Sequence, residues 1–502
     1  MSCNLYSKKK LWLRPNFLFF SVFYQAIDLT VIHVTYTVTN VMNNEPLITE
    51  LEDKTRCIQR ISKLYNKLLR SNRVFEQDQA GINISDIYTD RKNITKILIG
   101  ELLNGCYQPM QYDERKVYIN SKMRLIANYS YIDRLLLSLL YDLFRERTLH
   151  LISPSVYSYI SGRSAKQAIQ SFCSYLKQIQ EPNKQINLYV LRADITNYGG
   201  SIPADTHAIF WNYFYDILEE IKDLEQRDCL RIVIEEALRP ILHTEDNLPY
   251  QKIVGIPVGS PLATLIYNLY LSELDEALSD IPHGFYARYS DDFIYANTDL
   301  DLFKEGERRI SAILEKLRLR CNPDKNQRFY LTHAGRPFTD SEQFMGSNKI
   351  DLCGLIIFSD GTKTLKRAAI QKMLARIKHR LINATSMLAQ LDLEQKGQAL
   401  CKIANNILNE TNTFKDPTIQ RIFKEVTNRG SLKQIDNSIA LIIAELLTGI
   451  KGARAFRKIS YATLRNEWHL TSLCREKNYW DQHKFTFRKN GVFTYDKDKR
   501  FI

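Results

Sequence analysis

The chain has 502 residues, of which 44% are hydrophobic and 11% aromatic, so it carries enough apolar material for a sizeable core and is not intrinsically disordered. At roughly 150 residues per domain, this length predicts about three domains. The low counts of Gly (19) and Pro (14) exclude a fibrous or low-complexity protein. The formal net charge of +13 fits a polyanionic partner or, alternatively, a basic surface that is only solvated.

The first 41 residues differ in style from the rest. A basic Lys8–Lys10 precedes an aromatic, β-branched stretch that is interrupted by Arg14, Asp28 and His33. No uninterrupted run reaches the roughly 20 apolar residues that cross a bilayer, so we expect no stable membrane association. We interpret residues 1–41 as a poorly ordered extension or as sequence upstream of the true start, with a membrane anchor as the alternative.

Apolar residues recur at helical spacing early in the chain, over 47–69 and again over 132–144. The first of these predicts a helical N-terminal region at 42–114. The nine cysteines are widely spaced and include no Cys-x-x-Cys pair. Because disulfide frameworks and thiolate zinc sites require clustered cysteines, we expect reduced thiols and a cytoplasmic location.

Strand patterns occupy the middle of the chain. A short apolar run at 188–191 predicts a buried strand that ends near Asp194. Residues 285–295 predict two strands about a turn at Asp291, and 350–358 predict one arm of a hairpin. Strands flanked by helices indicate an α+β core.

Beyond residue 365 the apolar spacing is helical, which predicts a helical and basic C-terminal domain at 366–502. Residues 451–502 interleave Lys and Arg with aromatic rings. Cations for phosphates and rings for unstacked bases are typical of a single-strand RNA binder. The alternative is that the rings pack this domain while the charges are solvated.

Carboxylates mark the strands in the middle of the chain. Asp194 ends an apolar strand, and Tyr289-Ser290-Asp291-Asp292 lies inside an apolar hairpin. Paired carboxylates are costly there because desolvated like charges repel, unless divalent cations lie between them. Two Mg²⁺ ions would allow one in-line phosphoryl displacement, with Mn²⁺ as a possible substitute. The alternative is that Asp-Asp is ordinary turn chemistry.

These carboxylates belong to an ordered set of motifs that resembles the reverse transcriptases, specifically the bacterial lineage related to group II intron and retron enzymes. The resemblance implies a right-hand polymerase core of fingers and palm at 115–365, with an RRM-like antiparallel palm sheet. It also implies RNA-directed DNA synthesis from dNTPs by two-metal-ion phosphoryl transfer. The matching segments are, in chain order, Arg124–Arg134, Ser161–Ser164, Leu191–Ile195, Gly255–Pro261 with Asn268 and Leu274–Asp275, Tyr289–Asp292, Leu317–Lys325 and Leu352–Ile357.

Carried over to this sequence, the resemblance implies that Asp194, Asp291 and Asp292 are catalytic metal ligands, joined by the carbonyl of Ile195. Lys325 would donate a proton to the departing pyrophosphate, unless it is a solvated loop lysine. The expected dNTP-binding residues are Lys122, Arg124, Arg163, Tyr198 and Gly199, with surface ion pairs as the alternative for the three cations. The expected template or primer contacts are Gly255, Pro257, Val258, Gly259, Ser260, Tyr289 and Gly354.

Two departures from the family pattern stand out. Val258 replaces the usual Gln, and Ala263-Thr264 replaces the usual Ser-Pro, so the segment expected at the nascent base pair lacks an amide. Five positions after Asp194, Gly199 replaces an aromatic residue that excludes the 2′-hydroxyl. Either Tyr198 takes over that role, or sugar discrimination is weak.

These departures and the helical C-terminal domain resemble the defence-associated, abortive-infection reverse transcriptases of bacteria. That resemblance implies antiphage defence, a non-coding RNA partner, a DNA product and a homo-oligomer. A template-independent or protein-primed DNA polymerase is the first alternative. A maturase-like RNA-binding scaffold, in which the palm has no catalytic role, is the second.

Overall fold

The computed structural model describes residues 47–119, 122–180, 187–239, 241–243, 248–332, 344–409 and 425–475, all within the compact unit Pro46–Ile502. The predictions made for residues 1–41, and those for the tail beyond residue 475, lie outside the described residues. Within the described ranges, no helix is long and apolar enough to span a membrane.

Short helices open the described chain. They are α1 (Leu47–Glu52), α2 (Lys54–Leu69), α3 (Ile84–Thr89) and α4 (Arg91–Leu103). The structure divides the helix predicted over 47–69 at Asp53, whose side chain accepts a hydrogen bond from the Thr55 amide and so caps α2. Ile61 of α2 is fully buried, as the helical spacing predicts, whereas Leu69 at the end of the helix is 47% exposed.

A hairpin and a buried helix follow. Strands β1 (Asp113–Ile119) and β2 (Lys122–Asn128) pair antiparallel, and α5 (Tyr131–Thr148) begins at Ser130, whose side chain accepts from the Asp133 amide. Buried leucines lie on several sides of α5. The helix therefore packs against the N-terminal helix α2 and also against helices that follow residue 194 in the chain. The prediction of a helix over 132–144 is confirmed.

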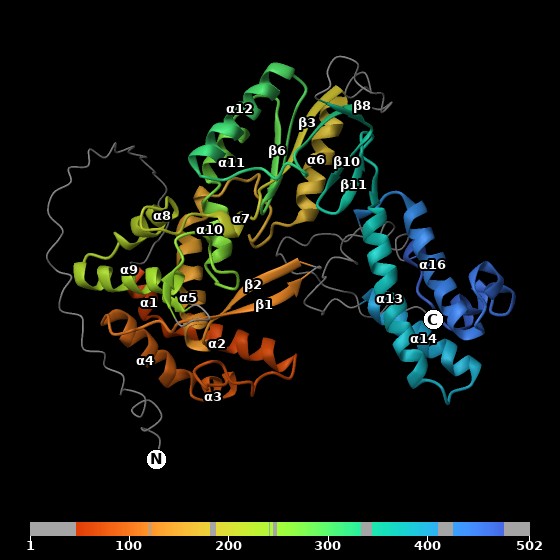
Figure 1. The fold of residues 1–502 in the computed structure, drawn as a ribbon, viewed down its shortest axis with the longest axis horizontal. Coiled ribbons are helices and arrows are strands. Elements are labelled where there is room, and N and C mark those ends of the chain that lie inside the picture. Colours follow the sequence, from red (N-terminus) through yellow and green to blue (C-terminus); the bar gives the residue numbers. More distant parts are fainter. Residues whose placement is uncertain are drawn as a thin grey trace, which may run out of the picture. The chain divides into compact units, whose positions relative to one another are not determined.

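The central sheet has five strands in the order β6-β7-β3-β8-β9. The strands are β3 (Asn187–Asp194), β6 (Phe285–Tyr289), β7 (Asp292–Asn297), β8 (Gln327–Thr332) and β9 (Met345–Ser347). All pairs are antiparallel except β8 with β9, which is parallel. Helix α6 (Ala165–Gln180) packs against this sheet, as do α11 (Ser272–Ser279) and α12 (Leu300–Lys316) (Figure 1).

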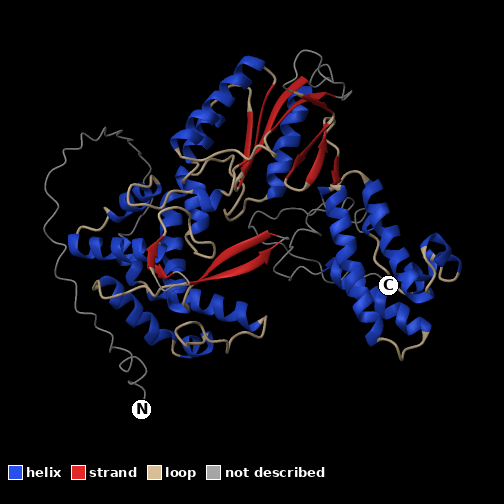
Figure 2. Cartoon of the chain, in the orientation of Figure 1, coloured by secondary structure: helices blue, strands red, loops and turns tan. Residues whose placement is uncertain are grey.

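Burial on both faces explains why the central strands are continuously apolar rather than alternating. Leu188 and Val190 of β3 belong to the hydrophobic cluster that contains α6, whereas Leu191 and Ala193 belong to the cluster that contains α12. Helices on both sides of red strands are visible in Figure 2. The structure thus confirms the predicted α+β class with a largely antiparallel sheet.

Between β3 and β6 the chain forms mostly helices. These elements are α7 (Tyr198–Ser201), α8 (Phe210–Leu218), α9 (Leu224–Leu238), β4 (Ile241–His243), β5 (Pro249–Gln251) and α10 (Ala263–Leu269). An apolar face on α8 packs against α5 and α9.

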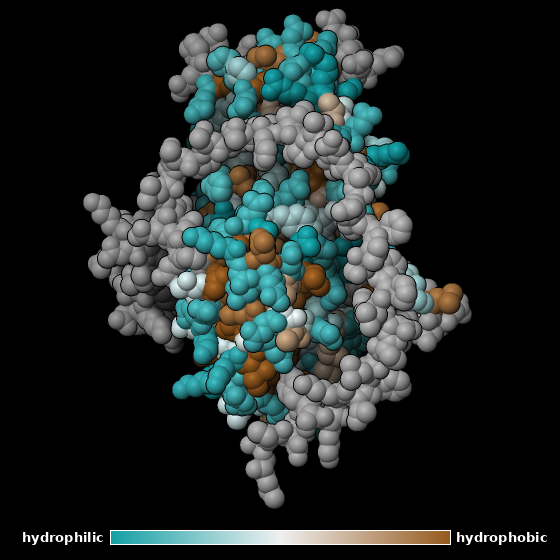
Figure 3. All heavy atoms as spheres, turned by 90° about the vertical axis from the view of Figure 1, so that its left-hand side faces the viewer, coloured by the Kyte–Doolittle hydropathy of each residue, from teal (hydrophilic) through white to brown (hydrophobic). Residues whose placement is uncertain are grey.

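Figure 3 shows one face of the molecular surface, on which hydrophobic side chains form patches among hydrophilic ones rather than one continuous apolar area.

After the sheet comes a three-stranded unit and then helices. The elements are β10 (Lys349–Leu352), β11 (Leu355–Phe358), β12 (Lys363–Leu365), α13 (Arg367–Met387), α14 (Leu393–Asn409), α16 (Arg429–Thr448), η3 (Gly452–Arg457) and η4 (Thr463–Glu467). The segment 350–358, predicted as one arm of a hairpin, forms both strands of the β10–β11 hairpin, because the chain turns at Cys353–Gly354. The hydrophobic cluster that contains α6 continues through this unit into α13, α14 and α16.

Candidate active site

The three predicted carboxylates meet at one end of the two central strands. Asp194, the last residue of β3, lies directly opposite Asp292, the first residue of β7. The amide of Ile195 donates a 3.1 Å hydrogen bond to the carbonyl of Asp291. Asp194 is only 8% exposed, so this strand end places a buried carboxylate beside two partly buried ones.

Asp291 is held in a tight turn between β6 and β7. Ser290, which precedes it, has a φ of 63°, in the left-handed region that costs a non-glycine residue roughly 1–2 kcal/mol. Two neighbours hold this conformation: the Ser290 amide donates to Ser158 Oγ at 2.8 Å, and the Ser290 hydroxyl bonds the Tyr159 hydroxyl at 3.0 Å. The turn is therefore fixed from outside the hairpin, as expected for strained backbone at a functional site.

A buried ion pair beneath the turn was missed by sequence reasoning. Arg288 and Asp275 are both fully buried and form two hydrogen bonds of 2.6 and 2.7 Å. A further Arg288 nitrogen donates to the carbonyl of Ser290 at 3.0 Å, and Tyr286 donates to Asp275 at 2.7 Å. Asp275 lies in one of the matching segments and Arg288 directly precedes another, but nothing in the sequence shows that they meet.

Burial sets the electrostatics of the carboxylates. It raises the pKa of Asp291 above its ordinary value; the nearby charge of Asp194 adds to this, whereas Lys325 opposes it. Burial likewise raises the pKa of Asp292, although Arg192 at 3.5 Å partly offsets it. The charged forms of both acids are thus disfavoured in the protein alone. A bound cation would stabilise these charged forms and so lower both pKa values.

Lys325 lies beside the first carboxylate. Its Nζ contacts Asp194 Oδ2 at 2.6 Å, and the amide of Asn322 donates to the Asp194 carbonyl at 2.7 Å. The loop at 322–325 is therefore fixed to the end of β3. The contact disfavours the alternative that Lys325 is only a solvated loop lysine. The side chain is nevertheless 45% exposed.

The donor set fits a magnesium site in its chemistry. Carboxylate and carbonyl oxygens are the ligands Mg²⁺ prefers, and Asp194, Asp291 and Asp292 supply carboxylates at this strand end, directly before the predicted carbonyl ligand Ile195 in the case of Asp194. As they stand, no three His, Cys, Asp or Glu side chains of the described residues are arranged to hold a metal ion. Instead, Lys325 contacts Asp194 and Arg192 contacts Asp292. Bound divalent ions would supply Lewis-acid stabilisation of phosphate oxygens.

The three cations predicted to bind triphosphate have different surroundings. Arg124 is exposed on β2. Only the backbone of Lys122 is described, also on β2. Arg163 donates to the carbonyls of Ser153 and Val156 at 2.6 and 3.0 Å, so it fixes a loop rather than facing a ligand. For Arg163, a structural role replaces the predicted contact with triphosphate.

The predicted template-contact loop docks on β2. The Ala127 amide donates to the Val258 carbonyl at 2.7 Å, and a Cβ at Gly259 would lie 2.7 Å from the Ala127 carbonyl oxygen. With a φ of +111°, Gly259 accepts this close approach because it lacks a side chain. Val258 is 38% exposed, Pro257 is buried and Ser260 is 5% exposed. The loop therefore offers an apolar surface where the family pattern has an amide.

The turn of the β10–β11 hairpin also reaches the carboxylates. Cys353 and Gly354 form a two-residue turn in which both residues have positive φ. Burial and then the charge of Asp292 raise the pKa of Cys353 to about 12, which places the thiol near that carboxylate. Arg192 bridges the same two elements, because it contacts both Asp292 and Asp351. Tyr289, at the end of β6, is 40% exposed.

Tyr198 does not take the position of a sugar gate. Its ring is 3% exposed and its hydroxyl donates to the backbone carbonyl of Tyr267 at 2.6 Å. Gly199 accepts a 2.8 Å hydrogen bond from the Ile256 amide, and Gly255 donates to Ile202 at 2.7 Å. Tyr198 is therefore buried against α10 and is not accessible to a nucleotide, contrary to the prediction.

The described part of the C-terminal tail follows the packing interpretation. Trp468 is 7% exposed, and its ring lies so close to Gly397 of α14 that a Cβ there would clash. Arg465 contacts the buried Asp436 at 3.3 Å. The side chains of Phe456 and Tyr461 are half-buried, whereas those of Lys451, Arg454, Arg457 and Lys458 are exposed. The part of the predicted RNA-binding tail beyond residue 475 lies outside the described residues.

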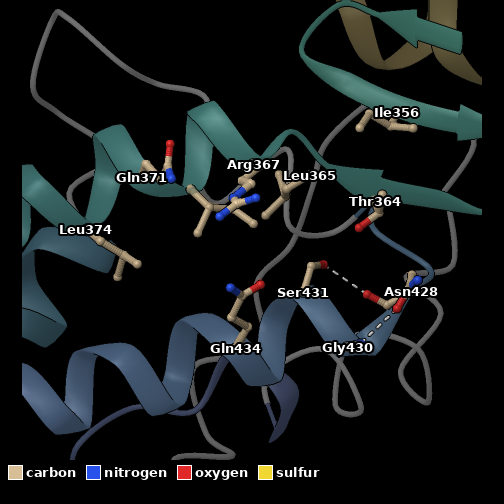
Figure 4. A pocket seen from close by; sticks show the side chains of 11 residues that line it. Ile356, Thr364, Leu365, Arg367, Gln371, Leu374, Asn428, Gly430, Ser431 and Gln434 are labelled. Atoms are coloured by element: carbon tan, nitrogen blue, oxygen red, sulfur yellow. Dashed lines mark hydrogen bonds between the residues drawn. The ribbon is translucent and has the colours of Figure 1, made fainter. Parts of the chain in front are cut away.

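A separate cavity of about 580 Å³ lies away from the carboxylates, between β11, β12, α13 and the start of α16. Figure 4 shows Gln371 and Gln434 facing it from two helices, while Asn428 caps α16 by accepting from the Gly430 amide. Its side chains are mixed polar and apolar, with no carboxylate among them. It is therefore not part of the candidate active site.

Comparison with known proteins agrees with this geometry. The reverse transcriptase (RNA-dependent DNA polymerase) family matches residues 113–366, and the chain belongs to that family. It is accordingly an RNA-directed DNA polymerase, a nucleotidyltransferase. Divalent metal ions, in general Mg²⁺, are used throughout the family.

Solved structures show more distant similarity. The structure of apo telomerase from Candida tropicalis is 12% identical, with a TM-score of 0.38, and the match covers 76% of this chain and 72% of that chain. Telomerase from Candida albicans in complex with the TWJ fragment of telomeric RNA is 12% identical, with a TM-score of 0.40, covering 75% and 67%. No curated protein sequence matches the chain.

Proposed function

We propose that Asp194, Asp291 and Asp292 hold two Mg²⁺ ions and that the protein adds dNTPs to a growing DNA strand copied from RNA. The observation that carries this proposal is the register pairing of Asp194 with Asp292, with Asp291 in the adjoining strained turn. Two-metal phosphoryl transfer needs oxygen ligands converging from separate elements, and this strand end supplies them. The carbonyl of Ile195 is the fourth proposed ligand.

The chain's own side chains have further roles in this proposal. Lys325, 2.6 Å from Asp194, is placed to give a proton to the departing pyrophosphate. Arg124, exposed on β2, binds the triphosphate, because a guanidinium can pair with two phosphate oxygens at once. Lys122, on the same strand, is the second candidate for that contact.

Template and primer meet two loops. The loop that contains Gly259 docks on β2 and presents the exposed Val258 to the template side, whereas Pro257 is buried. The Cys353–Gly354 turn lies near Asp292, which suits contact with the primer end. Gly255, Ser260 and Tyr289 complete the proposed template and primer surface.

We infer a specialised role from the two sequence departures. A loop without an amide at Val258, a glycine at 199 and a helical region after β12 support an enzyme that works with a dedicated non-coding RNA. In this proposal the protein acts in the cytoplasm, as a homo-oligomer, in antiphage defence. A template-independent or protein-primed DNA polymerase remains the second candidate, favoured by the same departures.

A scaffold without catalysis is less well supported. Burial raises the pKa of Asp291 and Asp292, and their neighbouring carboxylate repels them. A protein that only bound RNA would gain nothing from this unfavourable cluster. It would also gain nothing from the Lys325 contact with Asp194.

One experiment separates these candidates. The protein is purified from its native host, and both the RNA and the DNA that co-purify are sequenced. A discrete RNA with DNA complementary to part of it supports templated synthesis. DNA of random or homopolymer sequence supports the second candidate, and RNA without any DNA, with full biological activity of an Asp291→Asn/Asp292→Asn variant, contradicts both.

A further inference from the structure

Gly199 lacks a side chain, and another residue fills the space where one would lie. A Cβ built on Gly199 would be 2.4 Å from the hydroxyl oxygen of Tyr267 and 2.8 Å from its Cζ. Carbon and oxygen atoms that are not bonded do not approach so closely. A side chain at 199 and the present position of the Tyr267 phenol therefore exclude one another.

Tyr267 projects from α10 toward the candidate active site. Its ring lies 6.4 Å from that of Tyr159, whose hydroxyl bonds Ser290 in the turn before Asp291. Burial, and then Tyr159, raise the pKa of Tyr267 to about 12; the charges of Arg124 and Asp291 also act on it, in opposite directions. The phenol is therefore neutral at ordinary pH, and the contact of Tyr159 with Ser290 links its ring to the turn that holds Asp291.

The position of Tyr267 is fixed by its neighbours. The Tyr198 ring packs against it at a tilt, with ring centroids 5.5 Å apart, and the Tyr198 hydroxyl donates to the Tyr267 backbone carbonyl at 2.6 Å. The Gly199 backbone is held in turn by the Ile256 amide at 2.8 Å. Within the described part of the chain, the Tyr267 side chain is partly exposed, so part of it is accessible to a ligand.

We propose that Tyr267 distinguishes deoxyribose from ribose in the incoming nucleotide, in place of a side chain at position 199. The inference rests on the proposed use of this site for dNTPs. A rigid ring against the sugar leaves no room for an added 2′-hydroxyl, so the discrimination is steric. Tyr198 is the positioning residue that holds the ring.

The test is the ratio of dNTP to rNTP incorporation, as kcat/KM, for wild type and three variants. Tyr267→Ala lowers this ratio by about 10-fold to 100-fold, the range in which one small group is discriminated in a pocket. Tyr267→Phe keeps the ratio, because the ring rather than the hydroxyl excludes ribose. Gly199→Tyr combined with Tyr267→Ala restores it, because the new side chain occupies the vacated space.

A ratio in Tyr267→Ala equal to that of wild type overturns the inference, as does a wild type without preference for dNTPs. Tyr267→Met serves if the alanine variant unfolds, because it fills the volume without a flat ring. Equilibrium binding of dATP and ATP decides the matter separately from turnover. An affinity ratio changed by Tyr267→Ala without any incorporation supports the inference and contradicts the polymerase function; an unchanged affinity ratio contradicts the inference alone.

Discussion

At the scale of single residues, the candidate site places carboxylates where burial disfavours their charge. Asp291 and Asp292 have raised pKa values because burial disfavours their charged forms. Sequence patterns located all three carboxylates, because the motifs occur in order. The patterns could not show that Arg192 and Lys325 would contact them, since those contacts depend on how separate elements pair.

The raised pKa of Asp291 predicts a stability effect with a definite sign. A carboxyl whose pKa is higher in the folded protein binds its proton more tightly there, so its charge lowers stability as pH rises through that range. In EDTA, Asp291→Asn should raise the Tm at pH 8 by roughly 2–4 °C, the shift expected from about 1 kcal/mol in a domain of ordinary size. The gain should shrink at pH 4, where wild type is protonated.

Added Mg²⁺ should reverse this order, since an ion that binds only the folded state stabilises it. Thermal unfolding with and without Mg²⁺ measures both effects. Asp280→Asn, at an exposed position, is the control and should respond like wild type. If Asp291→Asn is no more stable than wild type in EDTA, the electrostatic account of the site is wrong.

Lys325 gives a catalytic prediction. Replacing a general acid typically costs 10²–10⁴-fold in rate, so Lys325→Gln should lower kcat by about 100-fold or more with little change in KM. Lys316→Gln is the matched control, because Lys316 makes a surface ion pair with Glu273 away from the carboxylates. Steady-state incorporation of dNTPs measures both variants. Equal kcat values for the two would return Lys325 to the role of a loop lysine.

At the scale of elements, the β6–β7 turn depends on the buried pair beneath it. Removing one partner of such a pair typically costs about 3–5 kcal/mol, because the other charge stays buried and alone. Asp275→Asn should therefore lower the denaturant midpoint strongly, and Arg288→Met with Asp275→Leu should recover much of it. Urea unfolding of both variants checks this. A double variant as unstable as the single one would contradict the explanation.

The loop at Gly259 gives a second prediction for an element. Gly259→Ala places a methyl group 2.7 Å from the Ala127 carbonyl oxygen, so it should separate the loop from β2 and reduce templated synthesis by at least about tenfold. Gly81→Ala is the matched control: it also has positive φ, but nothing lies within 4 Å of the added Cβ. Equal activity of the two variants on a primed RNA template would show that the docking is not needed.

The sequence predicted elements well where a local residue pattern determines the structure, and poorly where contacts between distant segments determine it. The hairpin turn at Asp291 and the helix over 132–144 follow from local pattern. The parallel β8–β9 pair and the docking of Val258 on Ala127 do not, because they join segments far apart in the chain. Tyr267 was missed for the same reason: nothing in the sequence shows that it fills the space at Gly199.

At the scale of the whole molecule, two hydrophobic clusters meet at the central sheet, one on each face. The carboxylates lie at the end of the sheet, where β3 pairs with β7, a strand about 100 residues further along the chain. The net charge of +13 fits a nucleic-acid partner, and the exposed Arg124 on β2 is one described contributor. The division into parts at 42–114, 115–365 and 366–502 stays a prediction.

The most direct test of the central claim is DNA synthesis by the purified protein. Wild type and Asp291→Asn are incubated with a primed RNA, all four dNTPs and Mg²⁺, with Mn²⁺ in parallel, and the products are separated by length and sequenced. The account predicts DNA complementary to the RNA with wild type and a loss of at least about 100-fold with Asp291→Asn, whose missing charge weakens the metal site. Equal synthesis by the two proteins, or none by wild type with its native RNA present, would contradict it.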